Sequence, residues 1–232
     1  MVCVRYPRLG VPVRALFFDF DGVLWDSEVA ALQSWQETFA EHGHRMSLDV
    51  FATRLGTLGG TDPIDELERL VGAPIDREAI AGRRWDRKME LVRQLKPRPG
   101  VLTYIREGRE RGFALAVVST DDMDWILTGL EILGLVEAWD FIECADGDLT
   151  RAKPSPALYL DALDTLGIGA DEAIAIEDSP NGIRAAKDAG LYCVAFANEV
   201  TRRFDLSAAD VQVDSLEDLP LAEIARAADT VG

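Results

Sequence analysis

The chain has 232 residues, of which 48% are hydrophobic and 28% are charged, and its 24 basic against 41 acidic side chains give a formal net charge of −17. This composition supports a packed globular core, whereas the strong acidity disfavours nucleic acid and anionic membranes as partners. An anionic small substrate would also be repelled, so a phosphate site would need local cations or a metal ion.

Targeting and redox features predict a cytoplasmic protein. No apolar run reaches the length of a membrane-spanning helix, and the first residues hold prolines and scattered arginines where a signal peptide would have an apolar centre. The cysteines Cys3, Cys144 and Cys193 lack metal-binding spacing, and we expect reduced thiols. We expect a monomer or a weak homodimer, with no membrane or nucleic-acid partner.

The first predicted element is a buried strand at Ala15–Asp19, which ends in an acidic turn. Asp19 and Asp21 close a strongly apolar run, although unpaired carboxylates are costly to bury. Residues two apart in an extended chain point to the same face, and Gly22 allows a sharp turn after them. The pattern therefore predicts two acids side by side at an open end of the sheet.

The exit from this strand leads into a helix. We expect Asp26 or Ser27 to cap that helix, and we expect Asp26 and Glu28 to be hinge and capping residues rather than catalysts. Trp25 is compatible with two positions, at the border of the site or packed in the core.

Residues 28–97 are predicted to be helical throughout, because apolar residues recur near i, i+3 and i+4 spacing and no strand-like run interrupts them. A segment of this size can form its own bundle. Arg87 and Lys88 belong to a basic stretch whose default is a solvated face, and the alternative is that one of them faces the cleft. The expected helices are Val29–Glu41, Leu48–Leu55, Ile64–Val71 and Arg77–Leu95.

The remainder of the chain alternates between short apolar strands and amphipathic helices, which is typical of a parallel sheet. The predicted fold class is α/β, with a Rossmann-like parallel sheet and an inserted α-helical domain. We expect the α/β core domain at 12–27 and 98–221 and the helical domain at 28–97. The expected strands are Phe113–Ser119, Phe141–Cys144, Ile174–Glu177, Tyr192–Phe196 and Val211–Val213; the expected helices are Val101–Arg111, Trp125–Leu133, Ala157–Leu166 and Gly182–Ala189.

Polar clusters follow several predicted strands, and ligands of open α/β sheets bind beyond the carboxyl ends of strands. Asp19, Glu177 and Asp178 would offer hard oxygen ligands, which suit Mg²⁺. A carboxylate can attack phosphorus to form an aspartyl-phosphate, and a second can donate and then accept the proton. These clusters predict a metal-assisted phosphoryl site.

Four motifs at these strand ends resemble, in order, those of the haloacid dehalogenase superfamily. The inserted helices resemble its helical cap, and the subgroup resembled most is that of the β-phosphoglucomutase-like and phosphoglycolate-phosphatase-like hydrolases. The resemblance runs from about Ala15 to Leu219. The motifs are Asp19-Phe20-Asp21-Gly22-Val23-Leu24, Ser119, Lys153-Pro154, and Glu177-Asp178-Ser179 with Asn181-Gly182.

The resemblance implies a set of roles at a Mg²⁺ site. Asp19 would be the nucleophile and a metal ligand, and Asp21 would be the general acid and base, with its backbone carbonyl on the metal. Asp178 would bind Mg²⁺ directly, and Glu177 through water.

The remaining roles concern the substrate, a small phosphorylated metabolite. Ser119 would hold the phosphoryl group, and Lys153 would neutralise charge between nucleophile and phosphate. Thr120 and Lys88 are the further expected substrate contacts.

Three departures from the family pattern favour a phosphatase over a phosphomutase. Ala31 stands where the mutases carry a histidine, and residues 56–61 lack the cap arginine that grips a second phosphate. Asp121 would repel a second phosphate, so we expect a substrate with one phosphate. The alternatives are a phosphomutase and, from another class, a catalytically silent binding protein on the same fold.

Specificity is expected to come from the cap. Residues around Leu55–Thr61 would read the leaving group, and hinges near Trp25–Ser27 and Lys96–Gly100 would allow closure.

Overall fold

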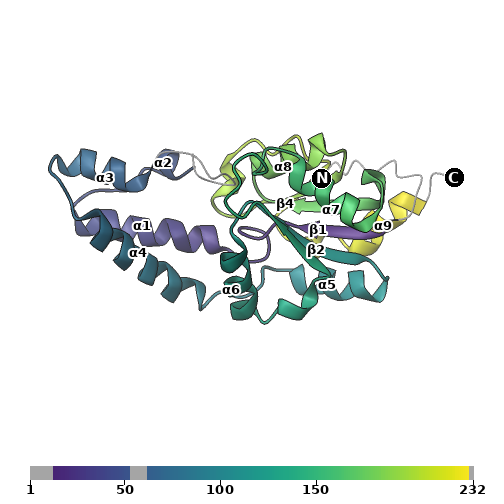
Figure 1. Cartoon of the computed structure of the whole chain (residues 1–232). Coiled ribbons are helices and arrows are strands. Elements are labelled where there is room, and N and C mark those ends of the chain that lie inside the picture. The colour runs from purple at the N-terminus through teal and green to yellow at the C-terminus, as the bar shows by residue number, and fades with distance from the viewer. Residues whose placement is uncertain (1–12, 53–61, 230–232) are drawn as a thin grey trace.

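The described strands form one six-stranded, fully parallel sheet with the order β3-β2-β1-β4-β5-β6. Helices surround this sheet in the larger part of the molecule (Figure 1). The computed structural model describes residues 13–52 and 62–229. Strands β1 and β4 lie side by side at the point where the order reverses, which is where ligands bind in such sheets. The strands are β1 (Ala15–Phe18), β2 (Ala114–Ser119), β3 (Phe141–Cys144), β4 (Ala173–Glu177), β5 (Tyr192–Phe196) and β6 (Val211–Val213).

Helices cover both faces of the sheet, which explains why the central strands are buried along their whole length. Alternate residues of each strand enter one of two cores. Phe18 packs with α5, α6 and α9, whereas Phe17 packs with α7 and α8 on the other face. These helices are α5 (Val101–Glu110), α6 (Met123–Leu133), α7 (Ala157–Leu166), α8 (Pro180–Asp188) and α9 (Leu221–Asp229).

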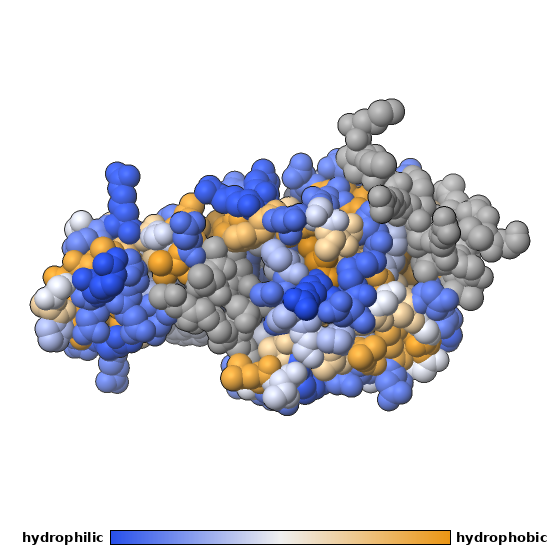
Figure 2. Space-filling model, turned by 90° about the horizontal axis from the view of Figure 1, so that it is seen from above, coloured by the Kyte–Doolittle hydropathy of each residue, from blue (hydrophilic) through white to orange (hydrophobic). Residues whose placement is uncertain are grey.

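In the described part of the chain, four of the helices that lie between β1 and β2 form a separate lobe to one side of the sheet (Figure 1). Their own apolar cluster includes Trp35, Phe39 and Leu67, and much of their outer surface is hydrophilic in Figure 2. The helices are α1 (Ser27–Glu41), α2 (Leu48–Ala52), α3 (Pro63–Val71) and α4 (Arg77–Val92). The expected fold class is thereby confirmed, and the residue boundaries of the two domains stay a prediction.

The capping prediction for α1 was only half right. Asp26 occupies the N-cap position, but its side chain makes no capping hydrogen bond. Asp26 instead pairs with Arg98 at 3.2 Å, and the Ser27 hydroxyl donates to Asp21. Side chains whose partners come from elsewhere in the fold override the local capping preference.

Arg98 joins the two connections between the lobe and the sheet. Its guanidinium donates to the carbonyls of Gly22, Phe196 and Ala197, and its backbone N–H donates to Leu24 O at 2.9 Å. One buried side chain therefore fixes the chain leaving β1 to the chain returning from α4. Within the described residues, no helix is long and apolar enough to cross a membrane.

Candidate active site

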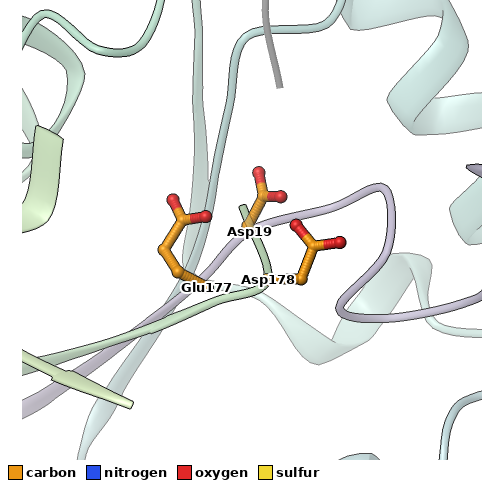
Figure 3. Close-up of side chains that lie close together, drawn as sticks. All are labelled: Asp19, Glu177 and Asp178. Atoms are coloured by element: carbon orange, nitrogen blue, oxygen red, sulfur yellow. The ribbon is translucent and has the colours of Figure 1, made fainter. Parts of the chain in front are cut away.

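Three buried carboxylates meet at the carboxyl ends of β1 and β4. Phe18 lies opposite Ile176 in the parallel register, so the next residues, Asp19 and Glu177, lie side by side. One ligand atom from each of Asp19, Glu177 and Asp178 lies within 4.8 Å of the others, and the carboxylates are seen together in Figure 3. The three residues expected to bind metal through side-chain oxygens therefore do come together.

Lys153 provides a fixed positive charge inside this cluster. Its Nζ lies 2.6 Å from Asp19 Oδ1 and 2.7 Å from Glu177 Oε1, and it also donates to Val118 O at 2.7 Å. The side chain is 2% exposed. Burial alone would lower its pKa, but the two carboxylates outweigh burial and raise the pKa. Lys153 is therefore a permanent cation between the expected nucleophile and Glu177.

Glu177 has only one of its two carboxylate oxygens fully engaged. Tyr159 donates its hydroxyl to Oε1 at 2.6 Å, whereas Oε2 is buried and has no hydrogen-bond partner among the described residues. An unpaired buried acceptor is costly. A cation in this position would provide the missing partner.

The electrostatics of the cluster also call for another cation. Burial raises the pKa of Asp19 to about 8, with Lys153 acting against the rise and Glu177 adding to it. Burial and then the Glu28 charge raise the pKa of Asp178 well above its ordinary value. Carboxylate oxygens without nitrogen or sulfur ligands form the donor set that Mg²⁺ prefers. The residues present therefore fit the expected ion.

Asp21 lies beside this cluster and is held by three donors. Trp25 Nε1 and Ser27 Oγ donate to its Oδ1 at 2.9 and 2.5 Å, and Trp125 Nε1 donates to its Oδ2 at 2.9 Å. Trp25 is fully buried in the core, and its indole also borders the site through the bond to Asp21. Both positions considered for Trp25 from the sequence therefore hold.

The hydroxyl residues at the carboxyl end of β2 form hydrogen bonds with neighbouring groups of the site. Ser119 Oγ donates to Asp121 Oδ2 at 2.7 Å, and Thr120 Oγ1 accepts from the Lys153 backbone N–H at 3.1 Å. Burial and then the Asp21 charge raise the pKa of Asp121 to about 7. The substrate contacts expected for Ser119 and Thr120 stay a prediction.

Of the two basic residues considered for the cleft, the structure favours Lys88. Arg87 pairs with Glu37 at 2.6 Å and Glu90 at 2.9 Å on the surface of the lobe. Lys88 Nζ lies 3.7 Å from the centre of the Trp125 ring, and burial lowers its pKa while the Asp21 charge opposes that shift. Its expected contact with substrate stays a prediction. The residues expected to read the leaving group, Leu55–Thr61, lie outside the described part of the chain.

Three participants were missed by sequence reasoning. Asn198 Nδ2 donates to Asp178 Oδ2 at 3.0 Å and to Glu28 Oε2 at 3.3 Å. Glu28 was expected to be a hinge or capping residue, but it adds a carboxylate beside Asp178, and burial and then Asp21 raise its pKa to about 8. Asn198 could have been found, because it follows β5 as the other site residues follow their strands. Trp125 carries no such local indication.

Comparison with known proteins agrees with this geometry. A family model described as haloacid dehalogenase-like hydrolase matches residues 13–190. YhcW of Bacillus subtilis (strain 168), which bears a phosphatase name, is 35% identical over 210 residues, covering 90% of this chain and 95% of the relative. The protein CbbY of Cereibacter sphaeroides is 33% identical over 222 residues, covering 89% and 94%.

Solved structures point the same way. The crystal structure of CbbY from Rhodobacter sphaeroides in complex with phosphate has a TM-score of 0.72 and 30% identity, and the match covers 91% of this chain and 99% of that one. A mutant of the same protein, solved with xylulose-1,5-bisphosphate, gives the same values.

Proposed function

This chain belongs to the haloacid dehalogenase-like hydrolases, and we propose that it uses Mg²⁺ to hydrolyse a small phosphate monoester through a phosphoryl group carried on Asp19. The observation that carries the proposal is the Asp19 carboxylate, which lies 2.6 Å from a buried lysine at the point where the strand order reverses. The phosphate and bisphosphate bound by CbbY support a phosphorylated substrate.

The chemistry assigned to the chain has two steps. In the first, an oxygen of the Asp19 carboxylate attacks phosphorus, the bond from phosphorus to the leaving oxygen breaks, and Asp21 gives its proton to that oxygen. In the second, Asp21 takes a proton from water, the water oxygen attacks phosphorus, and the Asp19 carboxylate and inorganic phosphate are released. Lys153 offsets negative charge on Asp19 throughout, and Ser119 would bind a phosphoryl oxygen.

The metal would be held by carboxylate oxygens of Asp19 and Asp178, with Glu177 close by and the backbone carbonyl of Asp21 as a further ligand. Bound Mg²⁺ would supply positive charge that offsets the acids and the incoming phosphate. Lys153 bridges Glu177 and Asp19 by pairing with both carboxylates, and Asn198 orients Asp178 by donating to its Oδ2.

Two features bear on the alternatives. The residues assigned to the chemistry, Asp19, Asp21, Lys153 and Asp178, are all retained and clustered, which favours an enzyme over a silent binding protein. Asp121 adds a negative charge next to Ser119, which favours a substrate with one phosphate, whereas the CbbY mutant holds a bisphosphate. A phosphomutase remains the alternative to a phosphatase.

A phosphate-release screen tests the proposal. The wild-type protein and Asp19→Asn are assayed with Mg²⁺ over sugar, polyol and carboxylic-acid phosphates, including bisphosphates, and again with EDTA. We expect release by the wild type alone, loss of release with EDTA, and a mass gain of one phosphoryl group on wild-type protein after rapid quenching. Equal activity of wild type and Asp19→Asn would refute the mechanism, and conversion of one sugar phosphate isomer into another without release would favour the mutase.

A further inference from the structure

The carboxylate of Asp21 is enclosed by indole N–H groups that come from two separate elements. Trp25 follows β1 and donates to Oδ1, whereas Trp125 lies on α6 and donates to Oδ2, each at 2.9 Å. Ser27 adds a second donor to Oδ1. Among the described residues, Oδ2 therefore accepts one hydrogen bond and retains a lone pair on which a transferable proton can sit.

The two indoles are held firmly by their neighbours. The ring centroids of Trp25 and Trp125 lie 5.5 Å apart, and Trp25 also lies 5.5 Å from Phe20. Gly129 on α6 packs so closely that an added Cβ would lie 2.4 Å from Phe20 and 2.6 Å from Trp25. The indole that donates to Oδ1 therefore has little room to turn away from Asp21.

The cap adds a contact to the same group. Lys88 of α4 places its ammonium 3.7 Å from the centre of the Trp125 ring, and Trp85 of α4 lies 5.8 Å from that ring. Cation–π contacts of this kind become stronger when they are removed from water. The face of Trp125 thus contacts the cap while its N–H holds the acid, so docking of the cap and orientation of Asp21 involve one side chain.

We propose that Trp25 and Trp125 are positioning residues that hold the Asp21 carboxyl group in the orientation needed to deliver its proton to the leaving oxygen. An indole N–H donates but cannot accept a proton, so it fixes the carboxylate without competing for that proton. The inference rests on the proposed function and adds to it the residues on which proton delivery depends.

Proton delivery can be separated from the rest of catalysis by the choice of leaving group. When the bond to phosphorus breaks, the departing alkoxide of glycerol 2-phosphate needs a proton from Asp21. The 4-nitrophenolate released from 4-nitrophenyl phosphate is a stable anion and needs none. The value of kcat/KM covers the steps up to and including the first phosphoryl transfer. The kcat/KM for glycerol 2-phosphate divided by that for 4-nitrophenyl phosphate therefore reports proton delivery.

The experiment compares this ratio in wild type, Trp25→Phe and Trp125→Phe. Phenylalanine keeps an aromatic ring and removes the N–H. General acid catalysis contributes about 10²- to 10⁴-fold, so loss of positioning is expected to lower kcat/KM for glycerol 2-phosphate about tenfold or more. The value for 4-nitrophenyl phosphate should change less than about threefold. Trp85→Phe is the matched control: Trp85 is 45% exposed and lies against Trp125, so its ratio should stay at the wild-type value.

The outcomes are distinct. A variant that merely folds poorly loses activity on both substrates equally, and equal losses or no loss in Trp125→Phe would overturn the inference while leaving the phosphatase intact. A wild-type protein that is soluble and folded but releases no phosphate from these two esters or from any ester of the phosphate-release screen would refute the proposed function, and the inference with it. A selective loss for the alkyl ester in both variants, but not in Trp85→Phe, supports it.

Discussion

Replacing Gly182 by alanine should destabilise the protein, although local preference predicts the opposite. Gly182 lies in helix α8, where alanine is normally favoured by about 0.5 to 1 kcal/mol. In the folded chain, however, an added Cβ would lie 1.8 Å from Glu177 Oε2 and 2.2 Å from its carboxyl carbon. The helix backbone therefore lies directly against the Glu177 carboxylate.

The magnitude follows from what holds that carboxylate. It would have to retreat by about 1.5 Å to reach ordinary van der Waals contact, and its bonds to Tyr159 at 2.6 Å and Lys153 at 2.7 Å would be lost. Hydrogen bonds that involve charged groups contribute about 1.5 to 3 kcal/mol each. After the helix preference is subtracted, we expect a net loss of about 2 to 5 kcal/mol.

Calorimetry in EDTA measures this loss as a fall in Tm of about 4 °C or more. Titration of Gly182→Ala with Mg²⁺ in an isothermal calorimeter should give an affinity about 10- to 100-fold weaker than that of the wild type, because Glu177, which lies beside the expected metal ligands, is displaced. Gly82→Ala is the control, since an added Cβ on that helical glycine meets nothing within 4 Å, and it should raise Tm slightly. A Gly182→Ala protein that melts at or above the wild-type temperature and binds Mg²⁺ normally would show the reasoning to be wrong.

Three further predictions concern the metal, the core and the hinge. In the metal-free protein, burial raises the pKa of Asp19 and Glu28 to about 8. Between about pH 4 and 8 the folded chain therefore holds more protons than the unfolded chain, and the free energy of unfolding falls as pH rises through that window. Mg²⁺ should therefore raise Tm more at pH 8 than at pH 5 in calorimetry, and equal shifts would contradict this. Tyr159→Phe keeps the ring and removes the hydroxyl bound to Glu177, so urea unfolding should show a loss of about 1 to 3 kcal/mol; an unchanged midpoint would count against a structural role for that bond. Arg98→Met leaves three carbonyls and Asp26 without their donor and should lower the free energy of unfolding by about 3 to 5 kcal/mol. The control Arg106→Met, on an exposed helix face, should lower it by less than about 0.5 kcal/mol. Similar losses of stability in both variants would disprove the assignment of Arg98 to the hinge.

Much of the fold could be predicted because its determinants are local. Apolar runs such as Ala15–Phe18 specify buried strands, and the spacing of apolar residues specifies the helices between them. Helix α9 (Leu221–Asp229) was not predicted at all. The other errors lie at element ends, where β1 closes at Phe18 and α4 closes at Val92, because helix and strand ends depend on their neighbours in space.

The clustering of Asp19, Glu177 and Asp178 could be predicted for the same reason. Each residue lies at the carboxyl end of a strand, and parallel strands bring these ends to one edge of the sheet whatever the intervening chain does. The sequence therefore predicted three acids of the site, and the resemblance to the family implied the lysine between them, whereas Glu28 was not expected there.

Two contacts of the site, Trp125 with Asp21 and Asn198 with Glu28, were decided only by the tertiary structure. Trp125 lies 104 residues from Asp21, and Asn198 lies 170 residues from Glu28, so no local spacing links either pair. Their contacts depend on how α1 and α6 pack against the ends of the strands. The positions of the strands along the chain follow from short-range patterns in the sequence. The orientation of an acid within the site follows from packing between distant segments, and that packing exists only in the folded protein.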